Sequence, residues 1–413
     1  MRVLMLTTSY PTFPGDFRGG FVEDLAQGLA SIGHEVQVLV PHPGGDAQES
    51  ESSAGVTVER VRSPRLLGHG TSAFGELGVL NSLAKNPGRA AEIALALAAL
   101  ARRALEAAAS CDLVITHWLV PGGVIGAALS HVRGIPHIAI EHGGGARVLS
   151  RMPGRSLALG FILSGSTAVQ LVSQQLKEQL ARAVPSSRDR LEALSLVFPA
   201  PLPGEPPAQS ARPYMPPPRI LFVGRLIEDK GIETLLAALG HLRHARLTVV
   251  GDGPQRMLAE TTSQESELSS RVTLTGLVPR PDMDAIYRAH DILVIPSLAG
   301  PFDEGGRSGA SGEGVPRVLL EGMAAGLVPV CSKVGGMPEV IRDGENGLLF
   351  PPGDSDALAR CLRSLANNPK LCARLAARAR RDATRYTLPS LLKLLDNRLR
   401  GEGIELRLAR PVR

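Results

Sequence analysis

Short runs of apolar residues recur along the chain at spacings that leave room for a helix between neighbouring runs. They lie at residues 1–8, 34–41, 56–61, 111–118, 134–142 and 168–173, and again at 219–224, 246–251, 271–276, 291–297, 327–332 and 346–350. Apolar positions at helical spacing predict helices over 21–32 and 89–109, one after Ser173, and three closing helices over 354–366, 369–382 and 388–399. Apolar strands alternating with helices are typical of parallel sheets covered on both faces. The pattern therefore predicts an α/β fold with two doubly wound, Rossmann-like domains facing across a cleft.

A proline-rich segment separates the two halves. Residues 199–218 contain nine prolines and show neither a helix nor a strand pattern, and proline stiffens such a connection. We expect an N-terminal domain over 1–198, a linker over 199–218 and a C-terminal domain over 219–385. Residues 386–413 would form a C-terminal helix that returns to the N-terminal domain, followed by a basic tail.

Composition narrows the class of protein. The 413 residues are 44% hydrophobic and 21% charged, as in soluble globular proteins, and only 3% aromatic, which argues against a nucleic-acid stacking surface.

The four cysteines form no CxxC pair, which indicates a reducing compartment and no structural zinc. No apolar run reaches the ~18 residues of a membrane span, and the first strand is too short for a signal peptide. We expect a cytoplasmic protein.

The positive charge is concentrated at the C-terminal end. The net charge of the chain is +5, but residues 360–413 alone carry +10 and the remainder −5. The basic run includes Arg374, Arg378, Arg380 and Arg381. One interpretation is a solvated helix face, and the other is peripheral attraction to an anionic membrane surface on the inner face of the membrane.

Two carboxylates, Glu313 and Glu321, flank the start of a predicted helix. Pro316 suits the first turn of that helix, because its missing N–H would be unpaired there. The apolar run 327–331 follows closely, so the helix N-terminus should lie at a sheet edge, where free N–H groups attract an anion. Two acids beside an anion site suit a ligand with a phosphate and several hydroxyls, such as a nucleotide sugar.

Arg225 follows the strand 219–224 directly, and Lys230 stands five residues later at a helix start. Both cations could bind a pyrophosphate above the strand ends and offset charge that develops on a departing phosphate. The alternative is a pair of surface cations beside Glu228 and Asp229.

Glycine pairs mark two further strand-to-helix turns. Gly19 and Gly20 precede the first helix, where backbone N–H groups can approach an anion; a plain tight turn explains them equally well. Gly335 and Gly336 could form a backbone nest for phosphate. The segment 251–256, GDGPQR, lacks the third glycine of a dinucleotide fingerprint.

His142 closes a strand and enters a three-glycine loop, so it could donate to a sugar hydroxyl or act near a leaving group. His117 competes for this role from the neighbouring strand, and a structural role is the alternative for both. The two D-x-D triplets, 282–284 and 354–356, precede helices and indicate helix caps rather than a metal site.

Taken in order, these segments resemble the retaining glycosyltransferases of family four, which have the two-domain GT-B fold. The similar segments of the second half are VGRLIEDKGIETLL, VVGDGPQR, VTLTGLV, DILVIPS, EGVPRVLLEGMAAGLVPV and GGMPEVIRDGENGLLFPPGD. The first half adds SYPTFPGDFRGGFVEDLAQGLASIGHEVQVLVP and AIEHGG. The EGVP sequence resembles the branch that builds bacterial exopolysaccharides.

The resemblance implies a role for each matching residue. Arg225 and Lys230 would bind the donor pyrophosphate, and Glu321 would accept from the ribose hydroxyls. The N-terminal domain would then be the acceptor side and the C-terminal domain the nucleotide-sugar side.

At the transferred sugar, the resemblance implies that Glu313 orients the ring and that His142 lies by the sugar and leaving group, with Gly20 near the phosphates. Val315 is also a donor-binding position, but the usual Phe-Gly is Val315-Pro316 here, which removes one backbone donor. The family pattern has no counterpart of the glycine-rich loop 299–312, so the resemblance implies no role for this loop.

We therefore expect a retaining, metal-independent hexosyltransferase without a cofactor. It would move a hexose from a UDP- or GDP-sugar to a glycan or lipid-linked acceptor in cell-surface polysaccharide synthesis. The alternatives are a nucleotide-sugar epimerase of the same fold and a non-catalytic nucleotide-sugar-binding partner subunit.

Overall fold

The computed structural model describes residues 1–13, 15–16, 18–63, 87–204, 216–265, 268–298, 314–401, 403 and 406. Glu313, the loop 299–312, part of the linker (205–215) and most of the basic tail lie outside these residues. The chain divides into two compact units. Unit 1 comprises Met1–Val172, Leu176–Phe198 and Leu388–Arg413, and unit 2 comprises Ser173–Gln175 and Pro199–Thr387.

Unit 1 is built on an eight-stranded sheet in the order β3-β4-β2-β1-β5-β6-β7-β8. All described pairings are parallel except that of β3 with β4. The strands are β1 (Arg2–Leu6), β2 (Glu35–Pro41), β3 (Ser50–Ser53), β4 (Val56–Val61), β5 (Leu113–His117), β6 (His137–Glu141), β7 (Ala168–Leu171) and β8 (Ser195–Val197).

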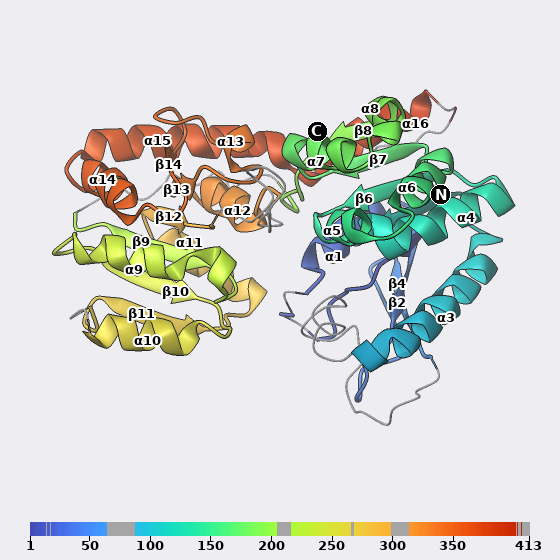
Figure 1. Ribbon diagram of the computed structural model, residues 1–413, viewed down its shortest axis with the longest axis horizontal. Helices are drawn as coiled ribbons and strands as arrows, with labels where there is room; N and C mark the ends of the chain where they lie inside the picture. Colours follow the sequence, from blue (N-terminus) through green and yellow to red (C-terminus); the bar gives the residue numbers. More distant parts are fainter. Residues whose placement is uncertain are drawn as a thin grey trace. The chain divides into compact units, whose positions relative to one another are not determined.

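Helices cover both faces of this sheet (Figure 1). They are α1 (Gly20–Ser31), α3 (Ala90–Ala108), α4 (Val124–Arg133), α5 (Gly144–Arg151), α6 (Arg155–Ser164), α7 (Gln174–Ala183), α8 (Arg188–Leu194) and α16 (Leu388–Arg400). Alternate residues of β1 sort the two faces: Val3 and Met5 pack with α1 and α16, and Leu4 and Leu6 pack with α3 and α4. A strand buried on both faces needs apolar residues throughout, which explains the unbroken runs in the sequence.

Unit 2 has a six-stranded sheet in the order β11-β10-β9-β12-β13-β14, with every described pairing parallel. The strands are β9 (Arg219–Val223), β10 (Arg246–Val250), β11 (Val272–Gly276), β12 (Ile292–Ile295), β13 (Val328–Ser332) and β14 (Leu348–Phe350). The six apolar runs of the second half correspond to these strands, so the predicted parallel sheet is confirmed.

The helices of unit 2 also lie on both faces of its sheet (Figure 1). They are α9 (Ile232–Gly240), α10 (Arg256–Glu265), α11 (Met283–Ala289), α12 (Arg317–Ala325), α13 (Met337–Val340), α14 (Ser355–Ala366) and α15 (Pro369–Ala383). One core cluster holds Leu235, Leu239 and Leu358 against Phe222, and the other holds Leu319 and Met323 among the side chains beneath α12.

Each sheet reverses its strand order once, between β1 and β5 in unit 1 and between β9 and β12 in unit 2. In open parallel sheets, ligands bind beyond the carboxyl ends of the strands at such a reversal. These two places are therefore where a site is expected, and the candidate residues follow the strands that flank them.

Some elements differ from the prediction. The edge strands β3 and β8 and the helices α4, α5, α6 and α8 were not expected. The three glycines after His142 are not a loop, because Gly143 is the N-cap of α5 and Gly144 and Gly145 form its first turn. None of the described helices is long and apolar enough to cross a membrane.

Candidate functional site

The amino end of α1 lies beyond β1, at the strand-order reversal of unit 1. Gly19 is its N-cap, with φ of 69°, and a Cβ there would lie 2.4 Å from the carbonyl oxygen of Ser9. A left-handed conformation and this close approach both require glycine. Gly20 is the first residue of the helix and is buried. The glycine pair thus brings the loop after β1 against the helix start.

His142 lies next to this helix start. The ring of Phe21, the second residue of α1, is 4.3 Å from the His142 ring between centroids, and Trp118 meets His142 edge-on at 5.6 Å. The structure therefore places Gly20 and His142 in one neighbourhood of unit 1. Phe21 and Trp118 carry no chemistry in the sequence pattern, so sequence analysis missed them.

His117 and His142 are partners rather than competitors. Nδ1 of His117 lies 3.0 Å from Nε2 of His142, and the two rings are inclined by only 8°. Burial lowers the pKa of His142 to about 3 and that of His117 well below its usual value, so both rings are neutral near pH 7.

The hydrogen positions on this pair follow from the surroundings. Nε2 of His117 is buried and has no hydrogen-bond partner among the described residues. The tautomer that leaves no buried N–H of His117 unpaired has the proton of His117 on Nδ1, from which it donates to Nε2 of His142. His142 then carries its own proton on Nδ1, and that N–H is the group it can offer to a ligand.

Glu141 holds the segment that carries His142. Its buried carboxylate accepts hydrogen bonds from the backbone N–H groups of Leu119 at 2.8 Å, Gly143 at 2.6 Å and Gly145 at 3.0 Å. Burial raises the pKa of Glu141, and these bonds oppose the rise. The residue ties the start of α5 to the turn after β5, and so fixes His142 between them.

In unit 2, Arg225 and Lys230 follow β9 at the strand-order reversal. The Arg225 side chain is exposed, and among the described residues it forms no ion pair with Glu228 or Asp229. Lys230 ends the short turn Glu228–Lys230, and Gly231 follows it with φ of 64°. A Cβ on Gly231 would lie 2.1 Å from the carbonyl oxygen of Pro296, so the turn rests directly on the segment after β12.

The GDGPQR segment supports the loop that carries Arg225. Gly251 approaches Gly224 so closely that a Cβ would lie 1.9 Å from the Gly224 carbonyl oxygen. Two backbone bonds, Leu226 N–H to Asp252 and Gln255 N–H to Leu226, join the same loops. Backbone packing thus explains these glycines. This agrees with the sequence analysis, in which the segment lacks the third glycine of a dinucleotide fingerprint.

Glu321 lies in the second turn of α12, and its carboxylate is held at both oxygens. The Tyr287 hydroxyl donates to Oε2 at 2.7 Å, and Nε of Arg317 donates to Oε1 at 2.9 Å. Burial, followed by the negative charge of Glu321, raises the pKa of Tyr287 well above 10, so its hydroxyl remains a donor. Each carboxylate oxygen keeps a lone pair for a further donor such as a sugar hydroxyl.

Val315 and the glycine turn after β13 lie in contact. The backbone N–H of Gly336 donates to the Gly314 carbonyl oxygen at 3.0 Å, and a Cβ on Gly336 would lie 2.8 Å from Cγ2 of Val315. The Gly336 N–H is therefore engaged within the protein and does not point to a phosphate here. Gly335, with φ of 61°, makes the turn itself.

Three other expectations can be compared with the structure. Asp354 caps α14 by accepting from the Ala357 N–H at 2.7 Å, whereas the Asp282 side chain caps nothing, because α11 has no side-chain cap. In the basic run, Arg378 is paired with Asp382 at 3.2 Å, so not every arginine there is available to a membrane. Among the described residues, no cluster of His, Cys, Asp and Glu is arranged to hold a metal ion.

Two family models match successive parts of the chain. The model described as "Glycosyl transferase 4-like domain" matches residues 19–196, and the model described as "Glycosyl transferases group 1" matches residues 208–382. The two matches meet near the unit boundary and together account for most of both units.

Individual proteins resemble the chain over most of its length. An uncharacterized glycosyltransferase of Methanocaldococcus jannaschii is 28% identical over 87% of both chains. A putative teichuronic acid biosynthesis glycosyltransferase of Bacillus subtilis, TuaC, is 25% identical over 88% of both. The crystal structure of Anabaena HepE in complex with UDP has a TM-score of 0.67 at 17% identity and covers 97% of this chain and 100% of that one, which shows a common fold.

Proposed function

Because this chain is a family-four-type glycosyltransferase of the GT-B fold, we propose that it transfers a hexose, with retention of anomeric configuration, from a nucleotide sugar to a glycan or lipid-linked acceptor. The observation that carries the proposal is the grouping of Arg225, Lys230 and Glu321 on segments that follow adjacent strands of unit 2. Two cations and an acid match the charges of a diphosphate and the hydroxyls of a ribose.

Each residue has a distinct task in this proposal. Arg225 and Lys230 bind the pyrophosphate and stabilise charge on it as the sugar leaves. Glu321, oriented by Tyr287 and Arg317, accepts hydrogen bonds from the ribose hydroxyls. Because Tyr287 and Arg317 already hold Glu321, little reorganisation of this carboxylate is needed when the donor binds.

Two further residues act on the sugar. His142 donates from Nδ1 to the transferred hexose, with His117 holding its tautomer. Glu313 lies outside the described residues, and its role of orienting the hexose rests on the family resemblance alone.

The reaction breaks the bond between the anomeric carbon and the β-phosphate oxygen, and forms a bond between that carbon and an acceptor oxygen on the same face. The departing phosphate takes the proton of the acceptor hydroxyl. No metal is required in this scheme, because the cationic side chains supply the counter-charge.

The test is release of nucleoside diphosphate from a panel of UDP- and GDP-sugars, with and without glycan acceptors. UDP-glucose is the first donor to try. Acceptor-dependent release is expected, and Lys230→Ala should lower it by several tens-fold. Lys370→Ala, at an exposed position on α15, is the matched control and should leave the rate unchanged.

The panel also separates the other activities of this fold. Conversion of the donor without acceptor and without nucleotide release would identify an epimerase. Donor binding without turnover with any acceptor would identify a binding subunit. Either result would replace the proposed transfer.

A role in cell-surface polysaccharide synthesis, with the chain in the cytoplasm at the inner membrane face, completes the proposal. Its support is the EGVP sequence, the similarity to TuaC and the basic C-terminal region. Vesicles of anionic phospholipid should bind the chain at low salt and release it as salt is raised. An absence of binding at low salt would remove the membrane part alone.

A further inference from the structure

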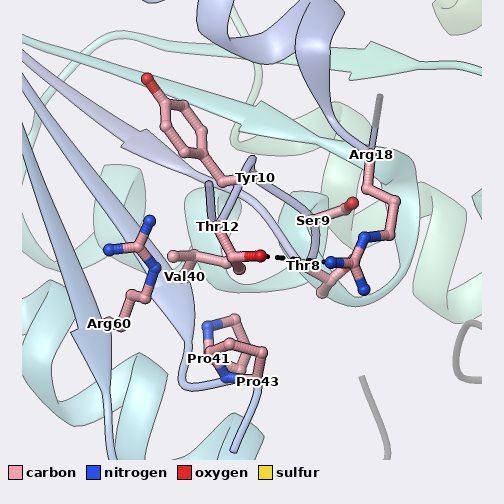
Figure 2. Close-up of a pocket in the computed structure, with 9 residues that line it drawn as sticks. All are labelled: Thr8, Ser9, Tyr10, Thr12, Arg18, Val40, Pro41, Pro43 and Arg60. Carbon is pink, nitrogen blue, oxygen red and sulfur yellow. Dashed lines mark hydrogen bonds between the residues drawn. The ribbon is translucent and has the colours of Figure 1, made fainter. Parts of the chain in front are cut away.

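Unit 1 contains a hollow that none of the proposed roles uses (Figure 2). Its lining is Thr8, Ser9, Tyr10, Thr12, Arg18, Val40, Pro41, Pro43 and Arg60. The space between the lining atoms is about 320 Å³, and part of it is open to solvent. These residues follow β1, lie at or just after the end of β2, or lie on β4, and those three strands are neighbours in the sheet. The hollow thus lies at the carboxyl ends of parallel strands.

The lining combines three apolar residues with hydroxyl groups and two arginines, and it contains no carboxylate. Arg18 and Arg60 are its charged members, and Figure 2 shows them on opposite sides of Thr12. The hydroxyls of Thr8 and Ser9 have no hydrogen-bond partner among the described residues. The side chains that line the space can therefore meet a ligand rich in acceptor oxygens.

Arg18 is held in position by its neighbours. Its guanidinium donates to both carboxylate oxygens of Asp16, at 2.8 and 2.9 Å, and to the Thr12 hydroxyl at 3.1 Å. The Asp16 side chain is 1% exposed and is not part of the lining. The counter-charge of Arg18 is therefore buried and is not part of the lining.

Arg60 supplies the observation that points to a ligand. The residue is 3% exposed, and its terminal nitrogens donate to the carbonyl oxygens of Pro11 at 2.8 Å and Gln48 at 3.1 Å and to Glu51 at 2.6 Å. Its Nε is buried and has no partner. Arg60 lines the hollow, and an unsatisfied donor on a buried charged group is unfavourable, so an acceptor oxygen that reached Nε would satisfy it.

We infer that this hollow binds the anionic group, a phosphate or a carboxylate, of the acceptor substrate. The oxyanion would accept from Nε of Arg60 and from the hydroxyl of Thr8, with Arg18 facing it across the hollow. The proposal rests on the proposed function only in naming the bound molecule as the acceptor. It predicts a sugar phosphate or a uronic acid at the accepting position rather than a neutral sugar.

Direct binding tests the inference without turnover. The full chain, saturated with UDP to occupy the nucleotide site, is titrated by calorimetry with glucose 6-phosphate, glucuronate and glucose. At least one charged probe should bind ten-fold or more tightly than glucose, and the preferred probe distinguishes a phosphate from a carboxylate.

Two variants locate the binding. Thr8→Val removes an unpartnered hydroxyl and should leave the fold intact, and Arg60→Lys keeps the charge but removes Nε. Each should weaken the charged probe three- to ten-fold without changing UDP affinity. Arg62→Gln is the matched control, because Arg62 pairs with Glu49 just after β4 and is not in the lining.

Equal binding of glucose and the charged probes would overturn the inference. So would unchanged anion binding in Thr8→Val and Arg60→Lys, or equal weakening by Arg62→Gln. Failure of UDP to bind counts against the proposed function instead. In that case the anion titrations are repeated without UDP, with Lys230→Ala as a variant that should leave them unchanged.

Discussion

The imidazole rings of His117 and His142 share one hydrogen bond, 3.0 Å long, between Nδ1 of the first and Nε2 of the second. His117 ends β5 and His142 directly follows the adjacent parallel strand β6, so the register of the sheet brings them together. One ring can face a ligand while the other decides which of its nitrogens carries the proton.

Replacing His117 with phenylalanine should therefore impair His142 without touching the ligand. His117→Phe removes the donor to Nε2, so His142 can shift its proton away from Nδ1. We expect kcat to fall about 10- to 100-fold, with a small change in the KM of the donor. His117→Asn restores an N–H at nearly the same position and should recover most of the rate. Equal loss in both variants would mean that His117 only fills space.

His137 should make stability depend on pH in the acidic range. Its ring is fully buried, bonded to Thr116 at 2.8 Å and Ser166 at 3.2 Å, and burial lowers its pKa to about 4 from 6.5. The unfolded chain binds the proton first as the pH falls, so this contribution is present above pH 6.5 and is lost between pH 6.5 and 4. The loss at pH 4 is about 3 kcal/mol at most.

The measurement is urea unfolding of the wild type and His137→Gln between pH 4 and 7.5. The variant should show a shallower decline with acid, whatever its stability at pH 7.5. Because the comparison is a difference, the other buried groups titrate in both proteins and cancel. Parallel pH curves would show that His137 does not cause the decline.

Gly231 and Gly240, near the two ends of α9, provide a matched pair. Gly231→Ala combines a φ of 64° with a Cβ 2.1 Å from the Pro296 carbonyl oxygen, so it should destabilise by about 2 kcal/mol and displace Lys230. A Cβ on Gly240 meets nothing within 4 Å. Gly240→Ala should be neutral or slightly stabilising. Thermal melts measure the first effect, and the affinity for nucleoside diphosphate measures the second. If Gly231→Ala keeps its affinity for nucleoside diphosphate, Lys230 does not contact the donor.

Removing the Tyr287 hydroxyl should loosen Glu321. The bond is a charge-assisted one of 2.7 Å, and such bonds contribute roughly 1.5–3 kcal/mol. Tyr287→Phe should raise the Kd of the donor about five- to ten-fold, because Glu321 must then be ordered on binding. The Kd of wild type and Tyr287→Phe is measured by titration with UDP and with a UDP analogue that lacks the ribose hydroxyls. A loss of affinity for UDP alone identifies the contact between Glu321 and those hydroxyls. An equal loss with both ligands would mean that Glu321 does not meet the ribose.

The fold was predictable where burial imposes a pattern. Central parallel strands such as β9 and β13 contain unbroken apolar runs, 220–223 and 328–331, which stand out in the sequence. The strand β3, SESS, is exposed at all four positions, and β8 is only half-buried. Short edge strands leave no periodic signal, because nothing requires their side chains to be apolar.

The candidate site was predictable only in part. Arg225, Lys230 and Glu321 were found because charged residues follow apolar strands at characteristic spacings. The partners that orient them were not, because contacts such as Tyr287 with Glu321 join residues 34 positions apart with no local pattern. His117 was found as a competitor of His142 and not as its partner, since the distance between two strand ends depends on the sheet register.

Helix α16 completes the core of unit 1. Leu391 and Leu395 of α16 pack in one cluster with Val3 and Leu29, and Leu388 lies where a Cβ on Gly28 would be, only 2.0 Å from its Cδ2. The residues of β1 and α1 are therefore synthesised hundreds of residues before α16, the helix that covers them. During synthesis, the apolar side chains of α1 that pack against α16 stay exposed to solvent until residues 388–400 have been made, and a nascent chain arrested earlier would present them to chaperones.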